Sequence, residues 1–230
     1  RALLVGLYEA SGVKPSLETG RPKDHRYNDA AMRQPGEGDQ PWTAYRKVHL
    51  IPFGETMPFG IAEDRLPQDF KMIPGALPQP LLEAWGLEWA PFICYEAILP
   101  GYVNDYVAGR RPDVLASLTN DSWFGDTWEP HQHLNFTRFR AVEHRAPLVR
   151  ATNTGISAFV SATGDVEMTL GVGVQDALIA EVPIVERGVT LYARIGYKLP
   201  WLLWAVAILA WLVALMRPPA SISDRPASNP

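Results

Sequence analysis

The feature that most constrains this chain is an uncharged, apolar segment near its C-terminus, LPWLLWAVAILAWLVALM at residues 199–216. As an α-helix, this segment would extend about 27 Å, close to the roughly 30 Å thickness of bilayer hydrocarbon. Its apolar residues cover every face, whereas a helix on the surface of a soluble domain keeps a polar face. We therefore predict a transmembrane helix over residues 199–217, with a buried core helix as the alternative.

The residues that flank this segment are typical of a membrane protein. Trp201 and Trp204, near its start, are of a type that gathers at the membrane–water interface. The tail after it, RPPASISDRPASNP, is rich in proline, serine and charge, so we predict that residues 218–230 are disordered. Positive charges lie on both sides of the segment, and they therefore do not orient it.

Residues 1–198 have the mixed pattern of one α+β domain. Short apolar runs that end in Asn, Asp or Gly predict strands. These runs are ALLVGLY, EWAPFICYE, DVLASLTN, PLVRATN and GISAFVSATG. Apolar residues at helical spacing predict a helix in HQHLNFTRFRAVEHRA and a shorter one in PLLEAWG. The polar residues 14–43 suit a long surface excursion, or a hairpin that carries YNDAAM.

Composition and charge exclude one class of partner. The 230 residues carry a net charge of −4 with both signs interspersed, so no basic stripe suggests nucleic acid. A single cysteine cannot close an intramolecular disulfide, and cysteine usage therefore reports no redox compartment. The chain begins at Arg1 with a strand already under way, RALLVGLY, which predicts a fragment of a longer protein.

Cys94, the only cysteine, lies in FICYEAILPGY and has two interpretations. It follows an apolar run and precedes Pro100 and Gly101, so it suits an elbow between a strand and a loop. A cysteine attacks as its thiolate, and such an elbow, with a cation nearby, would favour a nucleophile. A small buried hydrophobic residue is the alternative.

Lys47 and Glu55 supply an acid and a base in YRKVHLIPFGETMPF, where Pro52 and Gly54 force a turn. A lysine ammonium beside the sulfur would favour the thiolate and would stabilise an oxyanion. A solvated ion pair on a loop is the alternative. The histidines of HQH, residues 131–133, have no third ligand nearby in the sequence. We interpret them as helix surface residues and predict no metal site and no cofactor.

Four motifs resemble, in order and rough spacing, those of the nitrilase superfamily of carbon–nitrogen hydrolases. They are YRKVHLIPFGE, FICYE, TNDSWFG and RATNTGISAFVSATG. PFGE after the lysine, and TLYARIGYKLPW before the apolar segment, resemble the branch of bacterial apolipoprotein N-acyltransferases. The resemblance implies a four-layer α-β-β-α sandwich and a Glu-Lys-Cys triad. It covers nearly all of residues 1–217.

The resemblance also implies roles for individual residues. Cys94 matches the nucleophile, Lys47 the triad lysine, and Glu55 a further glutamate of the acyltransferase branch. Positions matched as supporting or substrate-binding are Tyr95, Glu96 and Asn28. The triad glutamate of the family lies in a Trp-Pro-Glu segment that would precede Arg1, so residues 1–198 would form a partial catalytic domain, inactive alone.

The implied reaction moves an acyl chain from a membrane phospholipid, through a thioester on Cys94, to an apolipoprotein. The acceptor is the α-amino group of an N-terminal diacylglyceryl-cysteine. The implied location is the bacterial inner membrane, with a multi-pass full-length protein and a periplasmic catalytic domain. Trp123, with Phe124 and Trp128, would line the lipid entrance, although buried packing is an equal alternative. A soluble amidase with the same cysteine and a catalytically silent binding module are the alternative functions.

Overall fold

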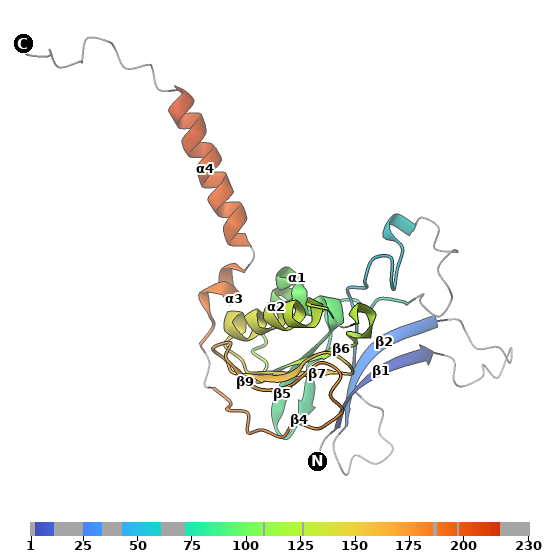
Figure 1. Cartoon of the computed structure of the whole chain (residues 1–230). Helices are drawn as coiled ribbons and strands as arrows, with labels where there is room; N and C mark the ends of the chain where they lie inside the picture. Colours follow the sequence, from blue (N-terminus) through green and yellow to red (C-terminus); the bar gives the residue numbers. More distant parts are fainter. Residues whose placement is uncertain are drawn as a thin grey trace, which may run out of the picture.

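The computed structural model describes residues 3–11, 25–33, 43–60, 72–107, 109–125, 127–185, 188–196 and 198–216. These residues form two β-sheets, a layer of helices and one long helix that extends away from the rest (Figure 1). The predicted disordered tail, residues 218–230, lies outside the described residues, as does much of the predicted excursion at 14–43.

The larger sheet has six strands in the order of the chain. They are β4 (Leu82–Ala84), β5 (Leu87–Ile93), β6 (Val114–Thr119), β7 (Leu148–Thr152), β8 (Ser157–Val160) and β9 (Val166–Leu170). The central strands β5, β6 and β7 are parallel, and the outer pairs are antiparallel. Strands covered on both faces read as continuous apolar runs. This pattern correctly predicted β5 to β8.

Two helices cross between the parallel strands. Helix α1 (Pro100–Val107) connects β5 to β6, and α2 (Glu129–His144) connects β6 to β7. Both connections lead to the next strand in the same direction along the sheet, and connections between parallel strands are right-handed. Both helices therefore lie over one face of the sheet (Figure 1). The prediction of α2 is confirmed. Helix α1 was not predicted from the sequence; Pro100 occupies its first turn, where proline is tolerated.

The prediction of a short helix in PLLEAWG is wrong. Leu82–Ala84 is strand β4, which pairs antiparallel with β5 across a two-residue turn. Trp85 and Gly86 in this turn have φ values of 56° and 74°. Two consecutive positive φ values are typical of the tight hairpin turn that matches strand twist. The hairpin therefore overrides the helical spacing of a short segment.

The smaller sheet is antiparallel and consists of β1 (Leu3–Ser11), β2 (His25–Arg33) and β3 (Thr43–Arg46). YNDAAM thus belongs to a central strand, in agreement with the predicted hairpin. Strand β2 lies against β4 and β5, and Ala30 and Tyr45 join the main hydrophobic core. The described residues thus form two sheets and a layer of helices, the α+β class that was predicted, and the four-layer sandwich stays a prediction.

The C-terminal part contains α3 (Leu191–Ile195) and α4 (Lys198–Met216). Helix α4 is long and apolar enough to cross a membrane, and none of it is buried against the rest of the structure. In Figure 1 it extends away from the domain beyond α3. The prediction of a long apolar helix is confirmed, and its alternative as a buried core helix is wrong for this structure.

Candidate active site

Cys94 lies at the carboxyl end of β5, where a 3₁₀ turn, Cys94–Ile98, begins. In open α/β sheets, sites form at the carboxyl ends of parallel strands. Cys94 has a φ of 50°, a left-handed conformation that is uncommon for a side chain other than glycine. Such conformations cost free energy and gather at functional sites. The structure therefore places Cys94 at the predicted elbow.

Lys47 and Glu55 form a buried ion pair. The Lys47 ammonium donates to both carboxylate oxygens of Glu55, at 2.9 and 2.7 Å. The same carboxylate accepts from the side-chain amide of Asn28 at 3.0 Å and from the backbone N–H of Ile51 at 2.9 Å. Lys47 is 1% exposed. The alternative of a solvated pair on a loop is therefore wrong for this structure.

The electrostatics of Cys94 differ from the prediction. Burial raises the pKa of the Cys94 thiol, while the Lys47 charge and a hydrogen bond with Thr119 lower it by less. The pKa of Cys94 consequently lies above its ordinary value. Lys47 favours the thiolate as predicted, but burial outweighs its effect, and the negative charges of Glu55 and Asp121 also raise the pKa of the thiol. Attack by Cys94 therefore requires a base that removes the proton.

Glu96 connects the lysine segment to the elbow. Its side chain is 0% exposed. Burial raises its pKa, and four hydrogen bonds oppose that rise. The donors are the backbone N–H groups of Val48, His49 and Ile93, at 2.6, 3.1 and 2.8 Å, and the Tyr45 hydroxyl at 2.7 Å. With every oxygen engaged, Glu96 holds the backbone beside Lys47 against the turn that carries Cys94.

The remaining predicted residues are more exposed. Tyr95 is half-buried, directly after Cys94. Trp123 lies in a 3₁₀ turn, Ser122–Phe124, and is 57% exposed. Phe124 and Trp128 are also exposed, so buried packing does not account for these three aromatic residues. Their part in lining a lipid entrance stays a prediction.

A further network beside Cys94 was missed at the level of sequence. The ring of His133, on α2, lies between Asp121 and the elbow: Nδ1 is 3.1 Å from Asp121 Oδ1, and Nε2 is 3.2 Å from the Cys94 carbonyl oxygen. Arg150, on β7, donates to Asp121 Oδ2 at 2.9 Å. The interpretation of His131 and His133 as surface residues is correct for His131, which is exposed, and wrong for the buried His133.

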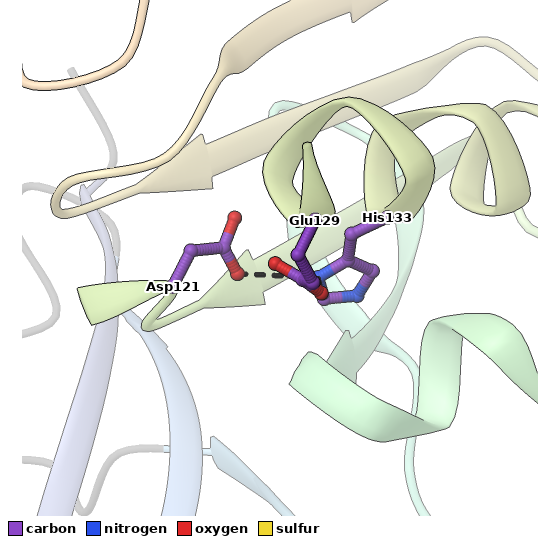
Figure 2. A group of neighbouring side chains, drawn as sticks. All are labelled: Asp121, Glu129 and His133. Atoms are coloured by element: carbon purple, nitrogen blue, oxygen red, sulfur yellow. Dashed lines mark hydrogen bonds and ion pairs between the residues drawn. The ribbon is translucent and has the colours of Figure 1, made fainter. Parts of the chain in front are cut away.

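Asp121, Glu129 and His133 could also be considered as metal ligands, because their ligand atoms lie within 4.8 Å of one another (Figure 2). Asp121 and His133 are already engaged, however, whereas Glu129 Oε2 has no hydrogen-bond partner among the described residues. Asp121 accepts from Thr119, His133 and the Arg150 guanidinium. A metal cation at this position would be repelled by the positive charge of Arg150, which is paired with Asp121. His133 Nε2 faces the Cys94 carbonyl oxygen. This arrangement fits a hydrogen-bond network better than a metal centre.

Two signals in the sequence pointed to this network. Arg150 interrupts the apolar run of a buried strand, and a buried arginine requires a partner. Asp121 lies two residues after the carboxyl end of β6, the neighbour of the strand that leads to Cys94. His133 gave no comparable signal, because its partners lie 12 and 39 positions away in the chain.

Comparisons with known proteins agree with this geometry. Apolipoprotein N-acyltransferase of Bradyrhizobium diazoefficiens is 38% identical over 203 residues, which cover 85% of this chain and 36% of that protein. The enzyme of the same name from Rhodopseudomonas palustris is 36% identical over 214 residues, covering 90% of this chain and 39% of that protein. The chain thus spans less than two fifths of the length of these relatives.

Solved structures share the fold. An amidase from Nesterenkonia sp. has a TM-score of 0.52 and 22% identity, covering 74% of this chain and 57% of that one. A carbon–nitrogen hydrolase from Helicobacter pylori G27 has a TM-score of 0.55 and 17% identity, covering 76% and 59%. Residues 2–190 of the chain match the family described as carbon-nitrogen hydrolase. With this match and the nitrilase-like fold, the chain belongs to the carbon–nitrogen hydrolase family.

Proposed function

We propose that the protein containing this chain transfers an acyl chain from a membrane phospholipid to an apolipoprotein, through a thioester on Cys94. The acceptor is the α-amino group of an N-terminal diacylglyceryl-cysteine. The observation that carries the proposal is the buried Lys47–Glu55 pair next to the strained Cys94 elbow. The similarity to enzymes named apolipoprotein N-acyltransferase supports this reaction over other acyl transfers.

In the first step, the Cys94 sulfur attacks the ester carbonyl carbon of the phospholipid. A general base removes the thiol proton, which is needed because burial raises the pKa of Cys94. The Lys47 ammonium and the backbone N–H of Tyr95 are the donors proposed for the oxyanion. The C–O bond of the ester then breaks, the leaving alkoxide takes up a proton, and the acyl chain remains as a thioester.

In the second step, the α-amine of the apolipoprotein attacks the thioester carbonyl. The amine loses a proton to the base, the C–S bond breaks and the thiolate is reprotonated. We propose that the base is the family's triad glutamate, in the Trp-Pro-Glu segment predicted upstream of Arg1. Glu55 suits that role less well than one of holding Lys47, since its oxygens already accept four hydrogen bonds.

Both proposed substrates reside in a bilayer. Helix α4 favours a membrane enzyme over a soluble amidase. Residues 201–216 are exposed throughout, with no neighbour in the described structure to cover them. A helix that is apolar on all faces needs such cover in water. We propose a location in the bacterial inner membrane, with further spans upstream and the catalytic domain on the periplasmic side. Trp123 would then contact the lipid.

The thioester is the intermediate that tests this proposal. The complete protein that contains this chain is incubated in detergent with phosphatidylethanolamine, and the peptide bearing Cys94 is analysed by mass spectrometry. An acyl adduct that hydroxylamine removes is the expected result, and it should be absent from Cys94→Ala. Adding a diacylated lipopeptide should discharge the adduct and yield an N-acylated product.

Trp123→Ala is the matched probe of lipid access, and Trp85→Ala, at an exposed hairpin turn away from the elbow, is its control. Trp123→Ala should slow acylation by the phospholipid, while a water-soluble ester should react at the unchanged rate. No adduct on Cys94 from any phospholipid, with the water-soluble ester still reacting, would instead support an amidase or esterase.

A further inference from the structure

A side chain from outside the turn contacts the backbone of the Cys94 elbow. The Cys94 carbonyl oxygen is 3.2 Å from Nε2 of His133, which projects from the first half of α2. The ring is 4% exposed, so water does not compete for this contact. Because Cys94 adopts a left-handed conformation, its backbone requires contacts that offset the cost of that conformation.

The two ring nitrogens of His133 both face acceptors. The Cys94 carbonyl oxygen can only accept a hydrogen bond, so Nε2 must donate. Nδ1 faces the Asp121 carboxylate, 3.1 Å away. Burial raises the pKa of Asp121, but the hydrogen bond from His133 and the charge of Arg150 outweigh burial and bring that pKa below its usual value. Both ring nitrogens of His133 are thereby held by oxygen atoms, one on each side of the ring.

Asp121 is in turn held in place from three sides. Thr119 donates to the same oxygen as His133, at 2.9 Å, and Arg150 donates to the other oxygen at 2.9 Å. Behind it lies Gly155, where an added Cβ would clash with the carboxylate of Asp121. Figure 2 shows Asp121 at the end of its strand with its carboxylate directed at the ring of His133. The orientation of the ring is therefore determined by the sheet.

We propose that His133, oriented by Asp121, is a positioning residue that fixes the plane of the Cys94–Tyr95 peptide. A trans peptide is planar, and its N–H points opposite to its C=O. Holding the Cys94 carbonyl toward α2 thus directs the Tyr95 N–H away from α2. A hydrogen-bond donor on the carbonyl also polarises the peptide and strengthens its N–H as a donor. The inference rests on the proposed role of that N–H toward the oxyanion.

The rates of two reactions of the Cys94 sulfur, acylation and alkylation, distinguish a positioning role from control of the thiol proton or of folding. Acylation of Cys94 by p-nitrophenyl butyrate passes through an oxyanion, whereas alkylation by iodoacetamide does not. A residue that positions an oxyanion donor should affect only acylation. A residue that controls the thiol proton should affect both rates, and a loss of folding should expose Cys94 and accelerate alkylation. Both rates are measured by mass spectrometry on the complete protein in detergent.

The variants keep or remove single contacts. His133→Asn keeps a donor near Asp121 but is too short to reach the Cys94 carbonyl, whereas His133→Gln places an amide N–H near the position of Nε2. We expect acylation to fall at least about tenfold in the Asn variant, as for loss of one oxyanion donor, and to fall less in the Gln variant. Alkylation should stay within about twofold in both. His131→Asn, exposed on the same helix, is the control.

Asp121→Asn provides a second test if His133→Asn does not fold, and it too should lower acylation relative to alkylation. The inference is overturned if the variants acylate like wild type, or if both rates fall in parallel. It is also overturned if the ester does not acylate wild-type Cys94. If the ester reacts and the variants behave as expected while phospholipid gives no adduct, the proposed substrate fails and the positioning role stands.

Discussion

Replacing Glu55 by Gln should destabilise the protein by about 3–5 kcal/mol, because it leaves a buried ammonium without its counterion. The side chain of Lys47 is 1% exposed and that of Glu55 is 10% exposed, so water cannot replace the lost charge. The two oxygens of Glu55 together accept from Lys47, Asn28 and Ile51. Glutamine keeps one oxygen, and its NH₂ group then faces a donor, which adds an unsatisfied polar contact.

Thermal unfolding of the complete protein in detergent measures this effect. For a domain of this size, about 3–5 kcal/mol corresponds to a fall in Tm of roughly 6–20 °C. Glu167→Gln is the control, because Glu167 is exposed on β9 and its substitution should change stability by no more than about 0.5 kcal/mol. An equal Tm for Glu55→Gln and Glu167→Gln would refute the reasoning.

A double variant separates stability from chemistry. Lys47→Met combined with Glu55→Leu removes both charges and replaces them with apolar groups of similar size. Because replacing a buried ion pair in this way is often neutral or stabilising, the Tm should recover toward the wild-type value. Formation of the Cys94 thioester should not recover, since the oxyanion has lost the lysine. Recovery of thioester formation would show that Lys47 has no chemical role.

Three further predictions concern single positions. Lys47→Met should shift the pH profile of Cys94 alkylation by iodoacetamide to higher pH: the Lys47 charge lowers the pKa of the thiol, so its removal raises that pKa and reduces the thiolate at any given pH. An unshifted profile would contradict the assigned contact. Gly155→Ala should displace Asp121 and cost about 1–3 kcal/mol, whereas Gly171→Ala, whose nearest contact is 3.8 Å, should not; Tm and acylation of Cys94 are the readouts. Leu209→Arg, in the middle of α4, should lower the vesicle-bound fraction in a flotation assay on the 230-residue chain alone, because a central charge costs about 2.5–3.5 kcal/mol on insertion. Met216→Arg, at the end of the helix, should have little effect, and equal effects would argue that α4 does not span.

Local patterns in the sequence were sufficient where a segment's own residues decide its structure. The uninterrupted apolar composition of residues 199–216 predicted α4, and continuous apolar runs predicted the parallel strands. Short segments were harder, because few residues carry the pattern. PLLEAWG has helical spacing, yet the positive φ values at Trp85 and Gly86 make it a hairpin whose partner strand supplies the missing hydrogen bonds.

The candidate site was predicted only in part for a similar reason. Motif resemblance indicated Cys94, Lys47, Glu55 and Asn28, and the structure gathers the last three around one carboxylate. It did not indicate His133, because a histidine on a helix is not distinguished by its neighbours in sequence. Its partners are Asp121, which follows β6, and the carbonyl of Cys94, which follows β5.

By itself, the sequence determined the chemical groups and the elements: one thiol, a lysine and a glutamate eight positions apart, short apolar strands and a helix apolar on all faces. Only the tertiary structure decided how these groups act. It paired Lys47 with Glu55, brought His133 to the elbow, and raised the pKa of Cys94 above its ordinary value. The physical reason is that desolvation and Coulomb interactions depend on distance and burial, which packing between residues remote in the chain creates.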